Sequence, residues 1–503
     1  MDPLANGMKH SMRTPEAEER HRYKQYFDTT GGEDTATHST AQNEELRTTP
    51  LLGVDVKFDA ADEHGETFCP QYALLGKHVG DHDQIPSDEP ILLNTNAPQS
   101  AFICGSQGSG KSYTLACMLE NCLRIDQDFG KLVKPLTGIV FHYDRNGTGA
   151  VAEAASLCSM GVKVRVLVSR SSWHTLAPAY RGVAGATAQN MEVLPLLLQD
   201  KHLEADRILK LMAFSDSETG MPLYMNVLLH ILRDTAVNGK QLKLAELESA
   251  LAAESFAPTQ KIMLSLRMQL LKSFCASSAQ LALTEAQARV PGKANKKRVA
   301  DQQPPIPEHD VFTLEPGTLT IIDLSDPFVD ASTACVLFDI CLGLVTASKQ
   351  SDNGLVIALD EAHKFLNKSP AAEVFTEQIL TTIRMQRHCA ARVYVATQEP
   401  TISERLLDLC SMSIVHRFTS PAWFSAIKEH LSGASGLTTS TEEQKAMFER
   451  IVKLPVGESL VFSPSSYVCT EQEGPGKLGS AVMAIKTRLR KGGDAGRSVL
   501  SMR

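Results

Sequence analysis

The segment Gly105–Ser112 reads GSQGSGKS and constrains the fold more than any other part of the chain, because it fits G-x-x-x-x-G-K-[ST] at every fixed position. Glycines in such a loop let backbone N–H groups converge on phosphate oxygens, and the positive N-terminal end of a following helix adds to the attraction. The apolar run SAFICG precedes the loop, and a helical pattern follows from about Lys111 to Leu123. This order of strand, loop and helix predicts a phosphate-binding loop in an α/β domain.

The loop residues expected to bind a nucleotide are Gly105, Ser106, Gln107, Gly108, Ser109, Gly110, Lys111 and Ser112. Lys111 is expected to reach the β- and γ-phosphates, and the hydroxyl of Ser112 to ligate Mg²⁺.

A pair of carboxylates follows a second buried strand. Asp360 and Glu361 come directly after the apolar residues 355–359, so a strand delivers them to the edge where open α/β sheets bind ligands. Asp360 is expected to hold Mg²⁺, and Glu361 to polarise the attacking water. The competing interpretation is a helix N-cap without a catalytic role, since aspartate also caps helices well.

Apolar strand-like runs alternate with helical segments, which predicts an α/β fold with a mostly parallel sheet flanked by helices. The pattern is interrupted by an all-helical insertion. The expected organisation begins with a disordered segment (1–50) and a small extension (51–98). The first part of the core (99–199) is followed by the helical insertion (200–275) and a flexible linker (276–310). The second part of the core (311–470) and a tail (471–503) complete it.

Three classes of nucleotide-binding protein fit poorly. The letters D-E-A-H at residues 360–363 are those of a class of RNA helicases, but the residues after Glu361 are too few for a second RecA-like domain. His363 is therefore expected on the first turn of the next helix, with no catalytic role. The GTPase motif N-K-x-D fails in NKSP (Asn367–Pro370), and LSGASG (Leu431–Gly436) follows the carboxylates instead of preceding them as an ABC signature would.

The motif order is the phosphate loop, a helical insertion, TIIDLS, LVIALDEAH, a strand ending in Thr397 and Gln398 about 40 residues after the carboxylates, and LPVGESLVF. Over roughly residues 95–465 this order resembles the HerA–FtsK group of P-loop ATPases, and the resemblance implies a RecA-like P-loop NTPase fold. The resemblance implies ATP and Mg²⁺ as cofactors, ATP hydrolysis, and a homo-oligomeric ring, with a hexamer favoured, that moves DNA or protein through its pore.

By the same resemblance Gln398 would sense the γ-phosphate, because its amide can bond both a phosphate oxygen and the attacking water. Arg387, eleven residues before Gln398, would be an arginine finger that acts in a neighbouring subunit. Arg384 and Arg417 are the alternatives for this role. The N-terminal β-barrel of some group members has no room here, and no winged-helix DNA-reading module follows the core, which leaves the substrate open.

Composition bears mainly on partners and location. The formal net charge of −8 argues against whole-surface binding to nucleic acid but leaves room for a local basic channel. The basic clusters GKANKKR (292–298) and KTRLRK (486–491) are read as solvated charge, with DNA contact or nuclear import as the alternative. The eleven unpatterned cysteines fit a reducing compartment, and the longest apolar run, Thr333–Ala347, contains Asp339. An intracellular, soluble protein without a membrane span is expected, nuclear or cytoplasmic, and it is either a DNA motor or an ATPase switch whose helical insertion binds a protein partner.

Overall fold

The computed structural model describes residues 43–65, 67–80, 85–145, 150–213, 223–276, 310–348, 353–432, 441–470 and 474–492. The chain divides into two units, at residues 1–48 and 49–503. In the first unit, residues 43–48 are helical, so the expectation of disorder through residue 50 is wrong for this turn. Residues 1–42 of that segment lie outside the described residues, as do residues 277–309 of the expected linker, with the GKANKKR cluster.

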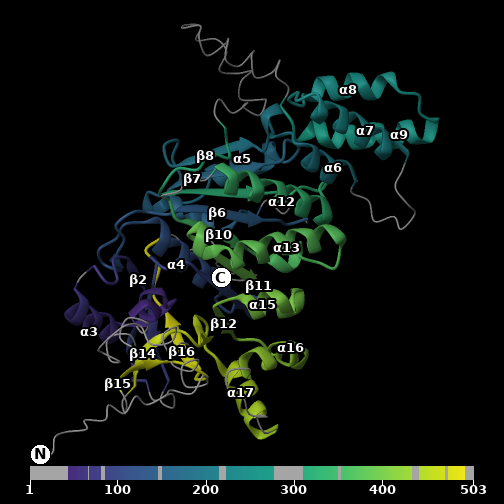
Figure 1. Ribbon diagram of the computed structural model, residues 1–503. Helices are drawn as coiled ribbons and strands as arrows, with labels where there is room; N and C mark the ends of the chain where they lie inside the picture. The colour runs from purple at the N-terminus through teal and green to yellow at the C-terminus, as the bar shows by residue number, and fades with distance from the viewer. Residues whose placement is uncertain are drawn as a thin grey trace, which may run out of the picture. The chain divides into compact units, whose positions relative to one another are not determined.

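The second unit is built on one sheet of sixteen strands in the described part of the chain, fifteen of them in the order β15-β14-β1-β3-β2-β16-β13-β12-β4-β11-β10-β6-β9-β7-β8 while β5 pairs with β2 (Figure 1). The strands are β1 Leu51–Gly53, β2 Tyr72–His78, β3 Pro90–Leu93, β4 Gln99–Cys104, β5 Gly130–Lys131, β6 Thr137–His142, β7 Lys163–Val168, β8 Met191–Pro195, β9 Thr318–Asp323, β10 Leu355–Leu359, β11 Ala391–Thr397, β12 Met412–His416, β13 Glu458–Phe462, β14 Tyr467–Thr470, β15 Gly474–Lys477 and β16 Met483–Thr487.

The eight strands from β12 to β8 in this order are all parallel to one another. Parallel strands are buried on both faces and read as continuous apolar runs, and β4, β6, β9, β10 and β11 are buried at every position. The prediction of an α/β fold with a parallel sheet is confirmed. From β13 onward the pairing is mostly antiparallel.

Helices cover both faces of the parallel part. The helices are α3 Val54–His64, α4 Lys111–Leu123, α5 Trp173–Arg181, α6 Ala205–Ala213, α7 Leu223–Val237, α8 Leu244–Ala253, α9 Pro258–Ser273, α12 Ala331–Ser348, α13 Pro370–Arg384, α14 Gln386–Cys389, α15 Glu404–Leu409, α16 Pro421–Ser432 and α17 Thr441–Lys453, with short 3₁₀ turns η1 Glu153–Met160, η2 Asp200–His202, η3 Ala362–Lys364 and η4 Pro400–Ile402.

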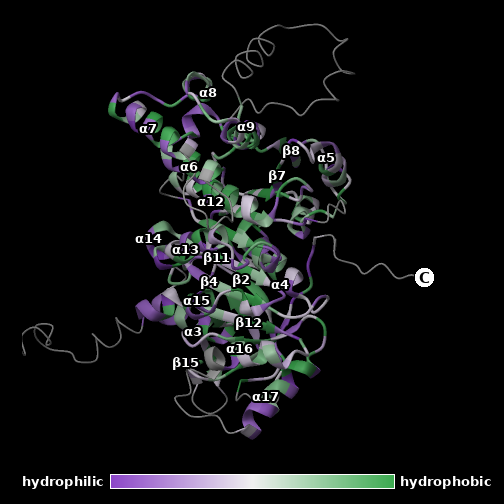
Figure 2. Cartoon of the chain, turned by 90° about the vertical axis from the view of Figure 1, so that its right-hand side faces the viewer, coloured by the Kyte–Doolittle hydropathy of each residue, from purple (hydrophilic) through white to green (hydrophobic). Residues whose placement is uncertain are grey.

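The two apolar clusters of the core follow from the two-residue period of a strand. Phe102 and Cys104 of β4 face the cluster that contains α12, α13 and the insertion helices. Ala101 and Ile103 of the same strand face the cluster that contains α4, η1 and α5. In Figure 2 much of the ribbon of the sheet is green, the colour of hydrophobic residues, whereas α17 carries much purple.

Helices α6 to α9 form the insertion between β8 and β9. The chain leaves and rejoins the core at one place, because Leu198 N–H donates to Phe274 O at 2.7 Å and Ala276 N–H donates to Leu198 O at 2.9 Å. This closure makes the insertion an appendage whose ends are held together by a parallel bridge between Leu198 and Cys275.

Helix α12 is, within the described residues, the one helix long and apolar enough to cross a membrane, and 72% of it is buried inside the protein. It packs against α13 and the sheet through Phe338. Asp339, which interrupts the apolar run, lies 2.9 Å from the Lys210 ammonium of α6. Burial raises the pKa of Asp339, and the Lys210 charge opposes this shift. These contacts are those of a core helix.

The end of the chain departs from expectation. Residues 471–503 were predicted to be a tail, yet β15 and β16 lie in the sheet, where β16 pairs with β13 and β2. The basic cluster KTRLRK lies on β16 and on the segment after it. Its arginines Arg488 and Arg490 are buried, with side chains 4% and 2% exposed, so the expectation of solvated charge is wrong for them.

Candidate nucleotide site

The phosphate loop joins β4 to α4, as the sequence predicts. Gly105, Gly108 and Gly110 have φ of +152°, +72° and +111°, a region that only glycine adopts readily. At Gly105 a Cβ atom would lie 2.7 Å from the Cβ of His416 and 2.8 Å from Ser109 Oγ. The loop therefore requires glycine there for two reasons, the backbone conformation and the close approach of β12.

Lys111 lies at the start of α4 and is only 4% exposed. Its ammonium donates to Ser106 O at 3.0 Å, and Ser106 in turn donates to Arg417 O through its N–H, at 2.9 Å, and its hydroxyl, at 2.8 Å. Burial lowers the pKa of Lys111, and Glu361 and Asp360 oppose this shift. Loop, lysine and carboxylates thus share one electrostatic environment.

The strand order explains why the separate motifs meet. Strand β11 lies between β4 and β10 and is parallel to both, with Thr397 beside Cys104 and Val395 beside Leu359. The carboxyl ends of parallel strands meet at one edge of a sheet. The phosphate loop after β4, Gln398 after β11 and the carboxylates after β10 therefore lie side by side.

Asp360 is buried, and its Oδ1 has no hydrogen-bond partner among the described residues. An orphaned buried carboxylate oxygen is costly unless a ligand completes it. Carboxylate and hydroxyl oxygens are ligands that Mg²⁺ prefers, and it binds through few protein groups. Asp360 and Ser112 fit such an ion.

His142 lies behind Asp360, with its Nδ1 3.7 Å from Asp360 Oδ2. Burial alone lowers the pKa of His142, but Asp360 and Asp323 outweigh it and raise the pKa. The strand GIVFHYD places a histidine at the end of β6, and only the parallel pairing of β6 with β10 brings it to the carboxylate.

Glu361 and Gln398 are in direct contact, because Gln398 Nε2 donates to Glu361 Oε2 at 2.9 Å. Glu361 has φ +51°, an uncommon conformation for a residue with a side chain. Strain of this kind clusters at functional sites. It turns the chain directly after Asp360, so two adjacent carboxylates leave the strand in different directions.

His363 contacts both members of this pair, and the expectation that it has no catalytic role stays a prediction. Its Nδ1 accepts from Gln398 N–H at 3.3 Å, and its Nε2 lies 3.5 Å from Glu361 Oε2. Because Nδ1 accepts, Nε2 carries the proton of the neutral ring. Burial lowers the pKa of His363, and Glu361 opposes the shift. The short turn η3, in place of the expected helix, brings the ring back toward Glu361.

The arginines are placed very differently. Arg387 lies on the exposed α14, before β11 begins, and Arg384 is exposed at the end of α13. The seven residues of β11 separate Arg387 from Gln398, which at the usual rise of a strand is roughly 20 Å. Arg417, half-buried, contacts the phosphate loop through its backbone. Of the three, only Arg417 lies beside the nucleotide site of its own chain.

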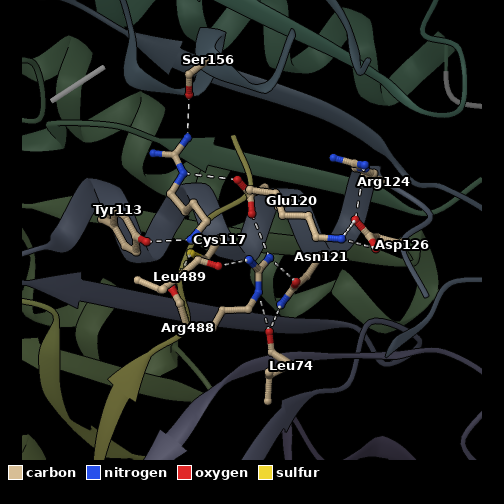
Figure 3. Close-up of polar contacts among 12 residues, drawn as sticks. Leu74, Tyr113, Cys117, Glu120, Asn121, Arg124, Asp126, Ser156, Arg488 and Leu489 are labelled. Atoms are coloured by element: carbon tan, nitrogen blue, oxygen red, sulfur yellow. Dashed lines mark hydrogen bonds and ion pairs between the residues drawn. The ribbon is translucent and has the colours of Figure 1, made fainter. Parts of the chain in front are cut away.

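A second charged cluster holds the other side of α4, and sequence reasoning missed it (Figure 3). We name Glu120, Glu153, Arg488 and Arg490 the α4 clamp. Arg488 lies 2.9 Å from Glu120 Oε2, and Arg490 lies 3.3 Å from Glu120 Oε1 and 2.8 Å from Glu153 Oε1. The partners are more than 330 residues apart in sequence, so no local pattern indicated them.

No family model and no curated protein matches the chain. Among solved structures, VirB4 of Thermoanaerobacter pseudethanolicus is 12% identical, with 83% of this chain and 96% of that chain covered and a TM-score of 0.48. The plasmid coupling protein TrwB in complex with ADP and Mg²⁺ is 8% identical, with 84% and 95% covered and a TM-score of 0.42. The genome packaging NTPase B204 from Sulfolobus turreted icosahedral virus 2 is 11% identical, with 35% and 70% covered and a TM-score of 0.22. Structures similar to this chain thus include a VirB4, a plasmid coupling protein and a packaging NTPase. The chain itself has an α/β fold with a mostly parallel sheet, in which a phosphate-loop sequence joins β4 to α4.

Proposed function

We propose that this protein binds ATP with Mg²⁺ and hydrolyses it, and that it works as a ring-forming motor of the HerA–FtsK type. The observation that carries the proposal is the 2.9 Å hydrogen bond between Gln398 and Glu361, beside a buried Lys111. Three motifs from three strands converge there, which a chance match to the loop pattern would not produce.

The residues divide the chemistry among them. Backbone N–H groups of residues 105–112 and the Lys111 ammonium hold the phosphates. Ser112 and Asp360 would hold Mg²⁺, which when bound neutralises charge on the phosphate oxygens. Glu361 accepts a hydrogen bond from the attacking water and so orients it toward the γ-phosphorus. Gln398 bonds both Glu361 and the γ-phosphate region, so it links the state of the nucleotide to the base.

His363 has a positioning role in this scheme. Its neutral ring accepts from the Gln398 backbone and points Nε2–H at Glu361. The histidine therefore holds the base and the sensor in register without touching the phosphates.

The ring is inferred from Arg387. Arg387 lies on an exposed turn at the far edge of the sheet and has no ion-pair partner among the described residues. It is also too far from Gln398 to act in its own site. In a closed ring of heterologous contacts, the far edge of one subunit meets the nucleotide edge of the next. We favour a hexamer, with DNA as the substrate polymer.

The deciding experiment measures the ATPase rate with and without single- and double-stranded DNA, together with particle mass in the presence of a non-hydrolysable ATP analogue. The motor proposal predicts stimulation by DNA and a mass near six chains. A monomer whose hydrolysis ignores DNA would contradict it.

A second candidate function is an ATPase switch that acts on a protein partner. It is favoured by the insertion, where Ile262, Met263 and Leu266 of α9 are 62%, 50% and 61% exposed. Neighbouring apolar side chains on one exposed helix are typical of protein contact surfaces. Hydrolysis that is indifferent to DNA but changes when α9 is made polar would support this function over the motor.

A further inference from the structure

The segment that follows β16 is held rigidly against α4. We name residues 488–491 the strap. Arg488 N–H donates to Leu75 O at 3.0 Å, and Arg490 N–H donates to the Tyr113 hydroxyl at 2.7 Å. The guanidinium groups of both arginines lie in the α4 clamp. Backbone and side chains of the strap are therefore fixed on the helix that begins with the phosphate-binding lysine.

The strap begins beside the phosphate loop. Thr487, the last residue of β16, has its hydroxyl 3.0 Å from that of Thr114 on the first turn of α4. Its N–H donates to Gly457 O at 3.0 Å, and Gly457 N–H donates to Ser109 O of the loop at 3.3 Å. Two hydrogen bonds thus connect the start of the strap to the loop.

Leu489 stands out on the strap because it is 85% exposed, the highest value among the large exposed apolar side chains of the described residues. The two-residue period of an extended chain explains its direction, since Arg488 and Arg490 on either side point into the clamp. A single exposed leucine is ordinary by itself. This one is held on a fixed backbone, next to the ring of Tyr113.

Tyr113 directly follows Ser112 and is half-buried. Its hydroxyl is occupied by Arg490 N–H, and the Arg490 guanidinium lies 5.5 Å from the ring centroid. Figure 3 shows the Tyr113 ring and Leu489 at the same end of α4, the end at which the phosphate loop lies. Leu489 and the ring of Tyr113 thus lie at the same end of α4, the end that begins with Lys111 and Ser112.

We propose that Leu489 and the ring of Tyr113 form a platform for the purine base of the bound nucleotide. This inference rests on the proposed function, since it needs phosphates in the loop. In a nucleotide so held the ribose and base lie outside the phosphate loop, and the base is the apolar, flat part. An aromatic ring and an aliphatic side chain contact such a face without directional bonds, so the platform binds adenine and guanine alike.

The test is Leu489→Ser, because an exposed side chain can be changed without disturbing the core. The probes are ATP, GTP and inorganic tripolyphosphate, each with Mg²⁺, and the readout is the dissociation constant. From the apolar area that a base covers, we expect affinity for ATP and for GTP to fall about three- to tenfold. Affinity for tripolyphosphate, which has no base, is expected to stay unchanged.

The matched control is Val237→Ser, an apolar residue at the end of α7 whose side chain is 80% exposed, which should alter none of the three constants. Unchanged ATP affinity in Leu489→Ser would overturn the platform. An equal loss for ATP and tripolyphosphate would also overturn it, since the strap would then act on the loop. Failure of the proposed function has a different signature, namely that the unaltered protein binds neither ATP nor tripolyphosphate.

Discussion

Two groups of buried charged side chains, the α4 clamp and the candidate nucleotide site, lie beside helix α4, and they differ in how their polar atoms are paired. In the α4 clamp each arginine lies within 3.3 Å of a carboxylate oxygen. At the candidate nucleotide site, Asp360 Oδ1 and both ring nitrogens of His142 are buried and have no hydrogen-bond partner in the part of the chain that the structure describes. Buried polar groups are normally paired because an unpaired one is costly. In the clamp every charge faces an opposite charge, although Glu120 Oε2 makes an ion pair without a hydrogen bond, and this pairing indicates a structural role. The unpartnered oxygen of Asp360 instead indicates a place where a ligand completes the candidate site.

The largest expected effect is that of Lys111→Ala, which should abolish ATP binding and turnover while the protein stays folded. The ammonium is buried with its pKa lowered by burial, so its removal costs the fold little and costs the phosphates their main cation. Nucleotide binding and denaturant unfolding are measured on the same preparation. A folded variant with an unchanged ATPase rate would show that the loop is not the site.

The sequence predicted the candidate nucleotide site and not the α4 clamp, for a physical reason. The phosphate loop, Asp360 and Glu361 are local patterns, because backbone conformation and phosphate chemistry require particular residues at short spacings. Parallel strand order then brings the motifs together, as the alternation of strands and helices predicts.

The clamp and His363 depend on tertiary contacts that no local pattern encodes. Arg488 and Glu120 meet only because β16 joins the sheet beside β2, and a run of basic residues looks the same whether solvated or buried. His363 approaches Glu361 only because Glu361 adopts a positive φ. Periodicity contains no signal for either feature.

Arg387→Ala tests an exposed charge that belongs neither to the α4 clamp nor to the candidate nucleotide site of its own chain. Its side chain is exposed, so we expect unchanged stability and ATP binding, with hydrolysis reduced about 10³- to 10⁵-fold if it acts as a finger in trans. Mixing this variant with Lys111→Ala subunits should restore part of the activity, because some interfaces then combine an intact loop with an intact arginine. Arg384→Ala is the matched control. A monomer that hydrolyses ATP normally without Arg387 would refute the ring.

Glu361→Gln asks whether the carboxylate is used in chemistry or in structure. The amide keeps the shape but cannot act as a base, so hydrolysis should fall about 10²- to 10⁴-fold while ATP stays bound. The measurement is single-turnover hydrolysis beside equilibrium binding of ATP. If ATP binding is lost instead, Glu361 supports the conformation of the phosphate loop, and the role of Glu361 is structural.

Glu120→Ala should mainly lower the free energy of unfolding, whereas Glu361→Gln should mainly lower the rate of hydrolysis. It leaves two buried arginines short of a partner, which typically costs about 3–5 kcal/mol of unfolding free energy. Lys491→Ala is the control, because Lys491 pairs with Asp126 and the exposed Asp128 at the surface, where ion pairs contribute little. Urea unfolding distinguishes the two variants. Equal, small losses in both would show that the clamp does not stabilise the fold.

The smallest expected effect belongs to His416, which contacts Thr114 of α4 and packs against Gly105 of the phosphate loop. Its ring is fully paired, because Nδ1 is 3.1 Å from Glu458 O and Nε2 is 3.1 Å from Thr114 Oγ1. A carbonyl oxygen can only accept, so Nδ1–H donates to it and Nε2 accepts from the threonine. Burial, with the Lys111 charge added, lowers the pKa of His416 to about 4.

The sign of the pH dependence follows from this shift. Between about pH 4 and the ordinary histidine pKa of about 6.5, the unfolded chain binds the proton and the folded chain does not, so stability falls as the pH falls. The full effect is about 3 kcal/mol, most of it lost by pH 4.5. His416→Gln lacks this titration, whereas His142, with its raised pKa, is present in both proteins and cancels in their difference. The unfolding free energy of the unaltered protein minus that of His416→Gln should therefore shrink by about 2–3 kcal/mol from pH 7 to pH 4.5. A difference independent of pH would mean that folding does not change the pKa of His416.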